Sequence, residues 1–405
     1  MKNITILHYT SFPIIAGVEL VIKEQAILMK NDGHNVKIVA GIGADFDAKI
    51  KTEIIKEIDP RNPKYLKMRG VLDEGKIPEN FEHYTDNLYQ KLNASLQKTD
   101  ILIIHQALTM HFNLALTCAL IKWIEKNKSS KIIHWTHDAT FLDQNYIKLY
   151  KKFQNQYPWS YLIRKNNGIK YVSISEERRN KIAQLFRISP SLIPIIPNGL
   201  IFDNFWNLDK KVKLLVKKHK LLDKDLVALL PMRIVRRKNI ELAIKITHLL
   251  NEKLNFVLLI TAPIDYQNPD ASLYYKELKQ LTKKLKIEDK VIFISEAFDI
   301  KNIDLKNLFA ITDFLLVTSK LEGFGMPLIE AAATKTPIVC SDINVFREIA
   351  KDSALYINLD QNYEKTAIEI LSYLKKIPTD RLFRRVINEY NLERIYQDKI
   401  KALLI

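Results

Sequence analysis

The sequence predicts an α/β protein built from two doubly wound domains. Short apolar runs rich in β-branched residues alternate with longer amphipathic segments, which is typical of βα units on a parallel sheet. This alternation occurs twice, and one irregular stretch over Asn198–Asn207 separates the two sets. A chain of 405 residues is also long enough for two domains that each bury a core.

In the first half, the segments with the length and composition of buried strands are Ile4–Tyr9, Val36–Ala40, Ile101–His105, Lys131–Trp135, Tyr171–Ser175 and Leu192–Ile196. The helical patterns between them cover Val18–Lys30, Tyr84–Leu96, Met110–Lys126 and Glu176–Leu185. Together they predict an N-terminal domain over residues 1–200.

In the second half, strands are expected at Leu226–Leu230, Phe256–Thr261, Val291–Ile294, Phe314–Thr318 and Pro337–Cys340. The helices are expected at Ile240–Leu250, Ser272–Leu285, Pro327–Thr334 and Glu364–Lys375. They predict a second domain over residues 201–390, followed at 391–405 by a terminal helix that could pack back on the N-terminal domain. Ligands bind beyond the carboxyl ends of the strands in such sheets, so two facing domains predict a cleft between them.

The composition argues against several classes of protein. The formal net charge is +16, but the Lys and Arg residues stand singly or in short pairs, so we expect no specific nucleic-acid binding. Weak attraction to an anionic membrane surface or to an anionic small molecule fits this charge better. No apolar stretch approaches the ~18 residues of a membrane span, and Cys118 and Cys340 have no metal or redox spacing. We expect a cytoplasmic protein, with the inner membrane surface as an alternative location, and the sequence leaves the oligomeric state open.

The segment Ser319–Ala333 has the residues of an anion-binding helix start. Its two glycines, Gly323 and Gly325, let the backbone approach a ligand, and the free N–H groups at the start of a helix attract an anion such as a diphosphate. Glu330 stands about one turn into the helix, where a carboxylate could accept hydrogen bonds from two neighbouring ribose hydroxyls. Glu322 would reach another part of the same ligand. The alternative is a surface loop with a capped helix and two solvated glutamates.

A second candidate segment, residues 233–238, reads Arg-Ile-Val-Arg-Arg-Lys and follows the predicted strand Leu226–Leu230. Arg233 and Lys238 could both hold a leaving diphosphate, because the guanidinium is a planar fork and the ammonium is a point charge. The alternative is a basic loop that is simply solvated.

In this order and spacing, these elements resemble the GT-B glycosyltransferases of family 4, the large retaining family that includes glycogen synthases and mannosyltransferases. The resemblance covers nearly the whole chain. The E-x7-E motif appears as Glu322…Glu330 and the R-x4-K motif as Arg233…Lys238. The shorter shared phrases are Gly17-Val18-Glu19, Asp32–Val36, His137-Asp138, Val172–Glu176 and Ile196–Gly199. The positions that depart from the pattern, each standing where a glycine is common, are Ala16, Met232 and Lys335.

The resemblance implies two facing Rossmann-like domains, the first binding an acceptor and the second a nucleotide diphosphate sugar. It implies that Arg233 and Lys238 hold the diphosphate as it leaves, that Glu330 binds the ribose, and that Glu322 contacts the donor sugar. Gly17 would approach the phosphates from the facing domain, and His137 would lie near the sugar on the acceptor side. The other donor-binding positions of the motif are Gly323, Phe324, Gly325 and Met326. No cofactor is required, and no divalent metal is expected to be ligated by the protein.

The implied reaction is retaining transfer of a hexose to an acceptor hydroxyl. GDP-mannose is the favoured donor on family frequency, and a small anionic sugar-acid glycoside is among the acceptors considered. The first alternative is a UDP-glucose-dependent glucosyltransferase acting on a lipid-linked or polysaccharide acceptor, with peripheral membrane contact. The alternative from another class is a basic nucleic-acid-binding protein that uses the fold as a scaffold.

Three weaker signals point to metal or polar sites elsewhere. Asp45–Asp47 has a D-x-D form, but acidic residues are common where a helix or turn follows a strand. His134 and His137 stand three apart, so on an extended strand they point to opposite faces, and they could share a metal only if the strand ends between them. His105 and His111 are expected to be polar loop or core residues rather than ligands.

Overall fold

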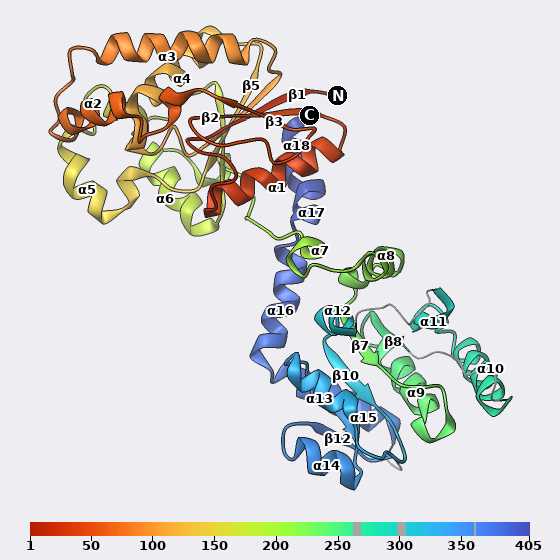
Figure 1. Cartoon of the computed structure of the whole chain (residues 1–405). Coiled ribbons are helices and arrows are strands. Elements are labelled where there is room, and N and C mark those ends of the chain that lie inside the picture. The colour runs from red at the N-terminus through yellow and green to blue at the C-terminus, as the bar shows by residue number, and fades with distance from the viewer. Residues whose placement is uncertain (262–268, 298–304, 360–361) are drawn as a thin grey trace. The chain divides into compact units, whose positions relative to one another are not determined.

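The computed structural model describes residues 1–261, 269–297, 305–359 and 362–405. In this part of the chain there are two compact units, one formed by Met1–Leu200 with Leu392–Ile405 and the other by Ile201–Asn391. Each unit contains a six-stranded sheet with parallel pairing throughout and with helices packed against it (Figure 1). The predicted α/β, doubly wound fold class is confirmed.

The first sheet has the strand order β3-β2-β1-β4-β5-β6. Its strands are β1 (Asn3–Leu7), β2 (Asn35–Ala40), β3 (Lys51–Ile54), β4 (Ile101–His105), β5 (Lys131–Thr136) and β6 (Ile169–Ser173). The chain runs outward from β1 to β3 and then returns to place β4 on the other side of β1. The strand order therefore reverses between β1 and β4, and ligands of doubly wound sheets bind at the carboxyl ends beside such a reversal.

Helices cover both faces of this sheet. They are α1 (Gly17–Asn31), α2 (Pro63–Asp73), α3 (Phe81–Leu96), α4 (Leu114–Lys126), α5 (Gln144–Tyr150) and α6 (Glu176–Phe186). Helices α3 and α4 pack side by side on one face, and α1 lies on the other (Figure 1). All five residues of β4 are buried, as expected for a central parallel strand covered on both faces.

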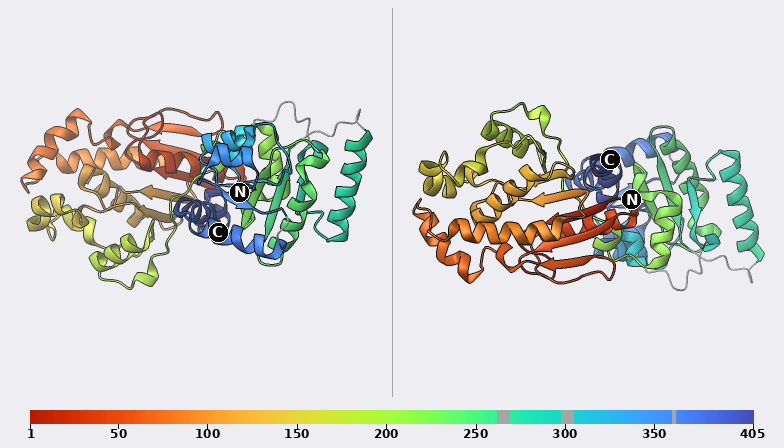
Figure 2. Two further views of the ribbon diagram at one scale, coloured as in Figure 1. Left: turned by 90° about the horizontal axis from the view of Figure 1, so that it is seen from below. Right: turned by 90° about the horizontal axis from the view of Figure 1, so that it is seen from above.

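The C-terminal segment belongs to the first unit. It consists of α17 (Leu392–Ile395), a π-helical turn (Tyr396–Ile400) and α18 (Lys401–Leu404). The hydroxyl of Tyr396 and the ammonium of Lys401 donate to the carboxylate of Asp32, over 3.1 and 2.7 Å. The segment, drawn in blue, lies beside the N-terminus of the chain in both views of Figure 2.

The second sheet repeats the topology of the first, in the order β12-β11-β10-β7-β8-β9. Its strands are β7 (Leu226–Leu230), β8 (Phe256–Ile260), β9 (Val291–Phe293), β10 (Phe314–Val317), β11 (Ile338–Ser341) and β12 (Leu355–Ile357). Here the strand order reverses between β7 and β10. The carboxyl ends of these two neighbouring strands are therefore where a ligand is expected.

The helices of the second unit are α7 (Phe202–Phe205), α8 (Lys210–His219), α9 (Ile240–Asn251), α10 (Pro269–Lys284), α11 (Ile294–Ala297), α12 (Leu305–Ala310), α13 (Met326–Ala333), α14 (Asn344–Ala350), α15 (Tyr363–Lys375) and α16 (Pro378–Glu389).

A buried ion pair links α16 to the amino ends of β7 and β10. Asp313 accepts hydrogen bonds from the Val227 backbone N–H, over 2.6 Å, and from the guanidinium of Arg384. Arg384 Nη1 also donates to the carbonyl of Lys224, over 2.9 Å.

One strand assignment from the sequence needs correction, and two strands were missed. The strand expected at Leu192–Ile196 is wrong, because the segment forms a 3₁₀ turn at Pro190–Leu192 and a single bridge between Ser173 and Ile195. Pro194 has no N–H and cannot extend a ladder. Strands β3 and β12 were not predicted, because they have only 4 and 3 residues and lie at sheet edges without a fully buried apolar run.

The residue after the C-cap of α13 carries a local strain. Lys335 has a φ of 59°, the left-handed conformation that most often ends a helix with glycine. This is one of the positions where a glycine is common in the family that the chain resembles. The lysine costs roughly 1 kcal/mol there.

Two further expectations can be compared with the described residues. None of the helices in these ranges is long and apolar enough to cross a membrane. Cys118 and Cys340, which have no metal or redox spacing in the sequence, are both buried free thiols, and burial raises the pKa of each to about 12.

Candidate active site

The loops that follow β7 and β10 are joined by backbone and side-chain hydrogen bonds. The N–H of Lys320 donates to the carbonyl of Arg237 over 2.9 Å. The hydroxyl of Thr318 donates to the carbonyls of Lys238 and Asn239, over 3.1 and 2.9 Å. Because β7 and β10 are neighbours, residues about 80 positions apart in the sequence form one rigid edge.

A largely buried ion pair between Lys238 and Glu322 stands at this edge. The side chains of the two residues are only 11% and 9% exposed. The hydroxyl of Ser319 donates to the same carboxylate oxygen over 2.7 Å, and Arg237 Nη1 lies 3.4 Å from the other oxygen and 3.1 Å from the Leu321 carbonyl. The carboxylate therefore holds the ammonium in a fixed place, where an anionic ligand would compete for it.

The other two arginines of this loop point elsewhere. Arg236 donates to both carboxylate oxygens of Glu277, over 2.8 and 2.9 Å, and to Asp270, and its guanidinium lies over the ring of Tyr274. Arg233 is exposed, and its side chain has no hydrogen bond or ion pair within the described ranges. Its planar fork is therefore available to a ligand.

The start of α13 presents its loop to solvent. Gly325 is the N-cap residue, and no side chain caps the helix. Phe324 and Met326 expose more than half of their surface, and Glu330 is half-buried one turn into the helix. The first N–H groups of α13 are therefore open to an anion.

The two glycines of this loop differ in how strongly the structure requires a glycine at their positions. Gly325 has a φ of 112°, and a Cβ there would lie 3.0 Å from Cε1 of Phe346. Gly323 lies in open space, with nothing within 4 Å of a Cβ. We expect Gly325→Ala to lower the free energy of unfolding by about 1–3 kcal/mol, and Gly323→Ala to change it by less than about 0.5 kcal/mol. Urea unfolding of the two variants measures these changes. Equal losses of unfolding free energy in the two variants would contradict the requirement for a glycine at position 325.

In the first unit, a cavity of 420 Å³ lies at the carboxyl edge of the sheet. Gly17, at the start of α1, and His137, just after β5, both line it, together with Glu19, Arg61 and Gln106. Two residues predicted from separate sequence phrases therefore share one cavity in this unit.

A chain of polar contacts links residues that line this cavity to the buried His105. Glu19 accepts a hydrogen bond from the hydroxyl of Thr10, and its carboxylate lies 3.9 Å from Nε2 of His8. Nδ1 of His8 donates to the carbonyl of His105 over 3.0 Å, and Nδ1 of His105 lies 2.9 Å from Nε2 of His137. Burial lowers the pKa of all three histidines, that of His137 to about 3, so the three rings are neutral at neutral pH.

Two buried histidines of the first unit, His137 and the completely buried His134 on β5, predict a loss of stability in acid. Burial lowers the pKa of His134 and His137 to about 3 from the ordinary value of 6.5. Between these pH values the unfolded chain binds more protons than the folded chain, so stability falls as the pH decreases. From pH 7 to pH 5 we expect each histidine to remove roughly 2 kcal/mol of stability.

Denaturation followed by tryptophan fluorescence measures this loss mainly in the first unit, which holds Trp123, Trp135 and Trp159 of the four tryptophans. The matched variant is His137→Asn, which cannot titrate. Its stability should fall by roughly 2 kcal/mol less than that of the wild type between pH 7 and pH 5. Identical pH dependence in the two proteins would contradict a buried, neutral His137.

The D-x-D segment forms local turns. Asp45 accepts from the Thr52 backbone N–H over 2.7 Å and from the Lys51 ammonium over 2.9 Å, and Asp47 accepts from the Lys49 N–H over 2.7 Å. Within the described ranges, no group of three or more His, Cys, Asp or Glu side chains is placed to hold a metal ion.

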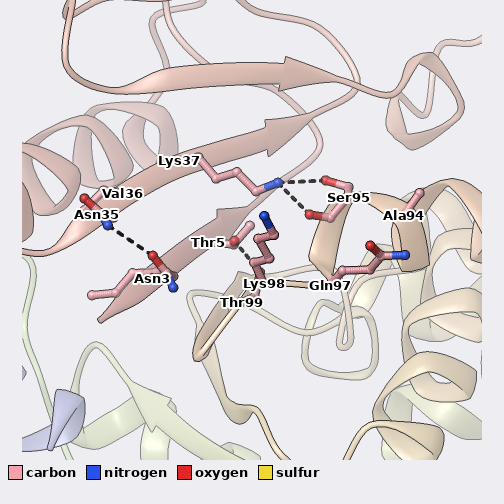
Figure 3. Close-up of a pocket in the computed structure, with 11 residues that line it drawn as sticks. Asn3, Thr5, Asn35, Val36, Lys37, Ala94, Ser95, Gln97, Lys98 and Thr99 are labelled. Atoms are coloured by element: carbon pink, nitrogen blue, oxygen red, sulfur yellow. Dashed lines mark hydrogen bonds between the residues drawn. The ribbon is translucent and has the colours of Figure 1, made fainter. Parts of the chain in front are cut away.

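Another cavity in the first unit, of 360 Å³, lies at the opposite edge of the sheet, around the amino ends of β1 and β2 (Figure 3). Lys37 points into it, but its ammonium donates to Ser95 and to the carboxylate of Glu53, and the hydroxyls of Thr5 and Thr99 bond each other over 2.8 Å. Its polar groups are largely paired with one another, and it lies away from the carboxyl ends where such sheets bind ligands.

Sequence reasoning missed several residues of these two sites. They are Arg237 and Ser319 in the second unit, and His8, Thr10, Glu19 and His105 in the first. One signal could have found the histidines. Strands β1, β4 and β5 each end at or just before a histidine, and the usual order of a doubly wound sheet makes these strands neighbours.

Comparison with known proteins gives a consistent result. The family model described as glycosyl transferases group 1 matches residues 212–391. The mannosylglucosylglycerate synthase of Thermotoga maritima is 24% identical over 96% of this chain and 95% of its own length. The O-antigen chain mannosyltransferase RfbU of Salmonella typhimurium is 34% identical, over 31% of this chain and 34% of its own length.

A crystal structure of a glycosyltransferase from Rickettsia africae ESF-5 aligns with 99% of this chain and 97% of its own at 19% identity, with a TM-score of 0.37. The identification rests on the family model and on the sequence relatives. The resemblance to the family 4 glycosyltransferases is thereby confirmed: residues 212–391 match the group 1 glycosyltransferase model, a relative over nearly the whole chain is a sugar-transferring synthase, and the chain is a glycosyltransferase.

Proposed function

We propose that the chain is a retaining mannosyltransferase, which moves mannose from GDP-mannose to the hydroxyl of a small anionic sugar-acid glycoside. The observation that carries the proposal is the cluster around Lys238 and Glu322, at the point where the strand order of the second sheet reverses. The names of the two relatives, a mannosyltransferase and a mannosylglucosylglycerate synthase, support mannose as the transferred sugar.

In this proposal the second unit binds the donor. The diphosphate takes the Lys238 ammonium from Glu322, binds the free fork of Arg233, and meets the open N–H groups of α13. Glu330 accepts from the ribose hydroxyls, and Glu322, released from its partner, accepts from the hydroxyls of the sugar. As the bond from the anomeric carbon to the phosphate breaks, the two cations neutralise the charge that develops on the leaving diphosphate.

The first unit would then bind the acceptor. Arg61 lines the cavity beside His137. Its Nε donates to Asp59 over 3.1 Å, and the terminal nitrogens of its fork have no partner within the described ranges. A carboxylate is the group that such a fork binds best. The relationship to a mannosylglucosylglycerate synthase, whose product name includes a sugar acid, supports an acceptor of this class.

Ligand-dependent thermal unfolding tests the donor assignment. The panel contains GDP, UDP, ADP, GDP-mannose, UDP-glucose and ADP-glucose, without added metal. At a hundredfold excess over Kd, a bound ligand stabilises the native state by about 2.7 kcal/mol, which raises the Tm by several degrees. We expect this rise with GDP and GDP-mannose.

Glu330→Ala is the matched variant in this panel, with Glu348→Ala on the exposed face of α14 as its control. Loss of charged hydrogen bonds to the ribose should weaken GDP binding by about 1.5–3 kcal/mol in the Glu330 variant. Stabilisation by UDP and UDP-glucose instead would make the chain a glucosyltransferase. A protein that responds to none of the six ligands would contradict the donor site.

A further inference from the structure

Three histidines occupy equivalent places on three neighbouring strands of the first sheet. His8 follows β1, His105 ends β4, and His137 follows β5. His105 stands between the other two and is completely buried. Its ring stacks on Trp135, with the centroids 5.7 Å apart and the planes at 16°, and on His137, with the centroids 5.2 Å apart.

The backbone at His105 is held by a strained turn. Gln106 has a φ of 60°, a conformation that residues with a side chain seldom adopt, and the Ala107 N–H donates across it to the His105 carbonyl over 2.7 Å. The same carbonyl accepts from Nδ1 of His8. Such outliers cluster at functional sites, where the surrounding structure over-determines them. The position of the His105 ring is therefore fixed from both sides.

The contacts of His105 determine where its proton lies. Nδ1 contacts Nε2 of His137 over 2.9 Å, whereas Nε2 is buried and has no partner within the described ranges. If the proton were on Nε2, a buried N–H would be left without an acceptor, which is rare in folded proteins. With the proton on Nδ1, His105 donates a hydrogen bond to Nε2 of His137. Only the lone pair on its own Nε2 then remains without a partner within the described ranges.

This arrangement also fixes the proton of His137. Since Nε2 of His137 accepts from His105, a neutral His137 carries its proton on Nδ1. Nδ1 has no hydrogen-bond partner within the described ranges, and His137 lines the cavity of 420 Å³. The group offered to a ligand is therefore an N–H donor and not a lone pair.

We propose that His105 is a positioning residue that holds His137 as its Nδ1–H tautomer, so that His137 donates a hydrogen bond to an oxygen of the bound substrate. The contact between the two histidines stands on the geometry of the first unit alone. The identity of the substrate, a sugar, rests on the proposed function. A ligand with only donors at this place would be rejected, because Nδ1–H needs an oxygen lone pair.

The tautomer can be measured directly. The full chain is labelled with [15N]histidine, and two-bond 1H–15N correlations assign the protonated nitrogen of each of the nine histidines. The His137→Asn spectrum identifies the His137 signals by their absence. We expect His137 to be protonated on Nδ1 in the free wild-type protein.

Two substitutions at His105 then separate positioning from packing. His105→Phe keeps the aromatic volume but has no donor, and we expect Nε2–H of His137 to become populated. His105→Gln can donate from its amide, and we expect the Nδ1–H form to be retained. The matched control is His111→Phe, which removes another buried histidine of this unit whose Nδ1 contacts Thr140 instead. It should leave the His137 tautomer unchanged.

Steady-state kinetics gives the second readout. In His105→Phe we expect kcat to fall by roughly 10–10²-fold, with recovery of most of it in His105→Gln. An Nε2–H form of His137 in the wild type, or an unchanged tautomer in His105→Phe, would overturn the inference. If His105→Phe does not fold, the wild-type and His105→Gln spectra test the inference, and an Nε2–H form of His137 in either protein would contradict it. If His137 is the Nδ1–H tautomer but the protein transfers no sugar, the contact between His105 and His137 is supported and the proposed function is rejected.

Discussion

Lys238→Ala is expected to lower the rate of sugar transfer by roughly 10²–10³-fold, the usual effect of removing a preorganised charge from a developing anion. The ammonium is already held in place by Glu322 before any ligand arrives, so the free protein need not reorganise to present it. The fold should survive, because Glu322 keeps its contacts with Ser319 and Arg237. Initial-rate measurements at saturating donor test this prediction.

The matched control is Arg236→Ala, which removes a cation two positions earlier in the same loop. Its guanidinium binds Glu277 and Asp270 on α10, and no contact joins it to Glu322 within the described ranges. We expect its transfer rate to stay within about threefold of the wild type. Wild-type turnover in Lys238→Ala, or equal losses in the two variants, would refute the assignment of the donor diphosphate to Lys238.

Arg384→Met is expected to lower the free energy of unfolding of the second unit by about 3–5 kcal/mol. Asp313 has a side chain with no exposed surface, and Arg384 is its ion-pair partner. Burial lowers the pKa of Arg384 to about 10, so the guanidinium remains charged at neutral pH. Without it, the buried carboxylate would keep, among the residues that the structure describes, only the Val227 backbone N–H as a hydrogen-bond donor.

Chemical denaturation followed by circular dichroism measures the loss, with two further variants for comparison. Arg385→Ala removes an exposed i,i+4 pair with Glu389 on the same helix and should cost about 0.3–0.5 kcal/mol. Asp313→Asn combined with Arg384→Met should recover much of the stability, because the amide oxygen can still accept from Val227 and no charge is left behind. A loss below about 1 kcal/mol in Arg384→Met would show that the pair is not the anchor of α16.

Most of the fold could be predicted because the strands that build it are short, apolar and regularly spaced. Strand β7 was predicted with its observed bounds, and β4 likewise, since each is a run of five buried residues bounded by a polar residue or a proline on each side. Strand β3 could not be predicted, because its sequence, Lys-Thr-Glu-Ile, is that of an exposed edge. Burial patterns carry little information where only one side of a strand meets the core.

The site could be predicted only as far as motifs and strand ends allow. The phrases containing Lys238 and Glu322 placed both residues after strands, and the sheet order brings them into contact. His105 was expected to be a polar loop or core residue rather than a ligand, and it is a buried residue at the end of β4. Its partner His137 is 32 positions away, and the contact depends on ring orientations that no sequence pattern records. The catalytic and binding roles of these residues stay predictions.

The hydrogen bonds that join the loops after β7 and β10 limit how this enzyme can be re-engineered. Lys320 and Thr318 on one loop bond the main chain of residues 237–239 on the other, so neither loop has a conformation independent of its neighbour. A chimera that takes only one of these loops from a relative would place it against a neighbouring loop of a different sequence, and these hydrogen bonds would be lost. Exchanging both loops as a single cassette, with the ends of β7 and β10 as the junctions, is the graft that keeps this edge of the sheet intact.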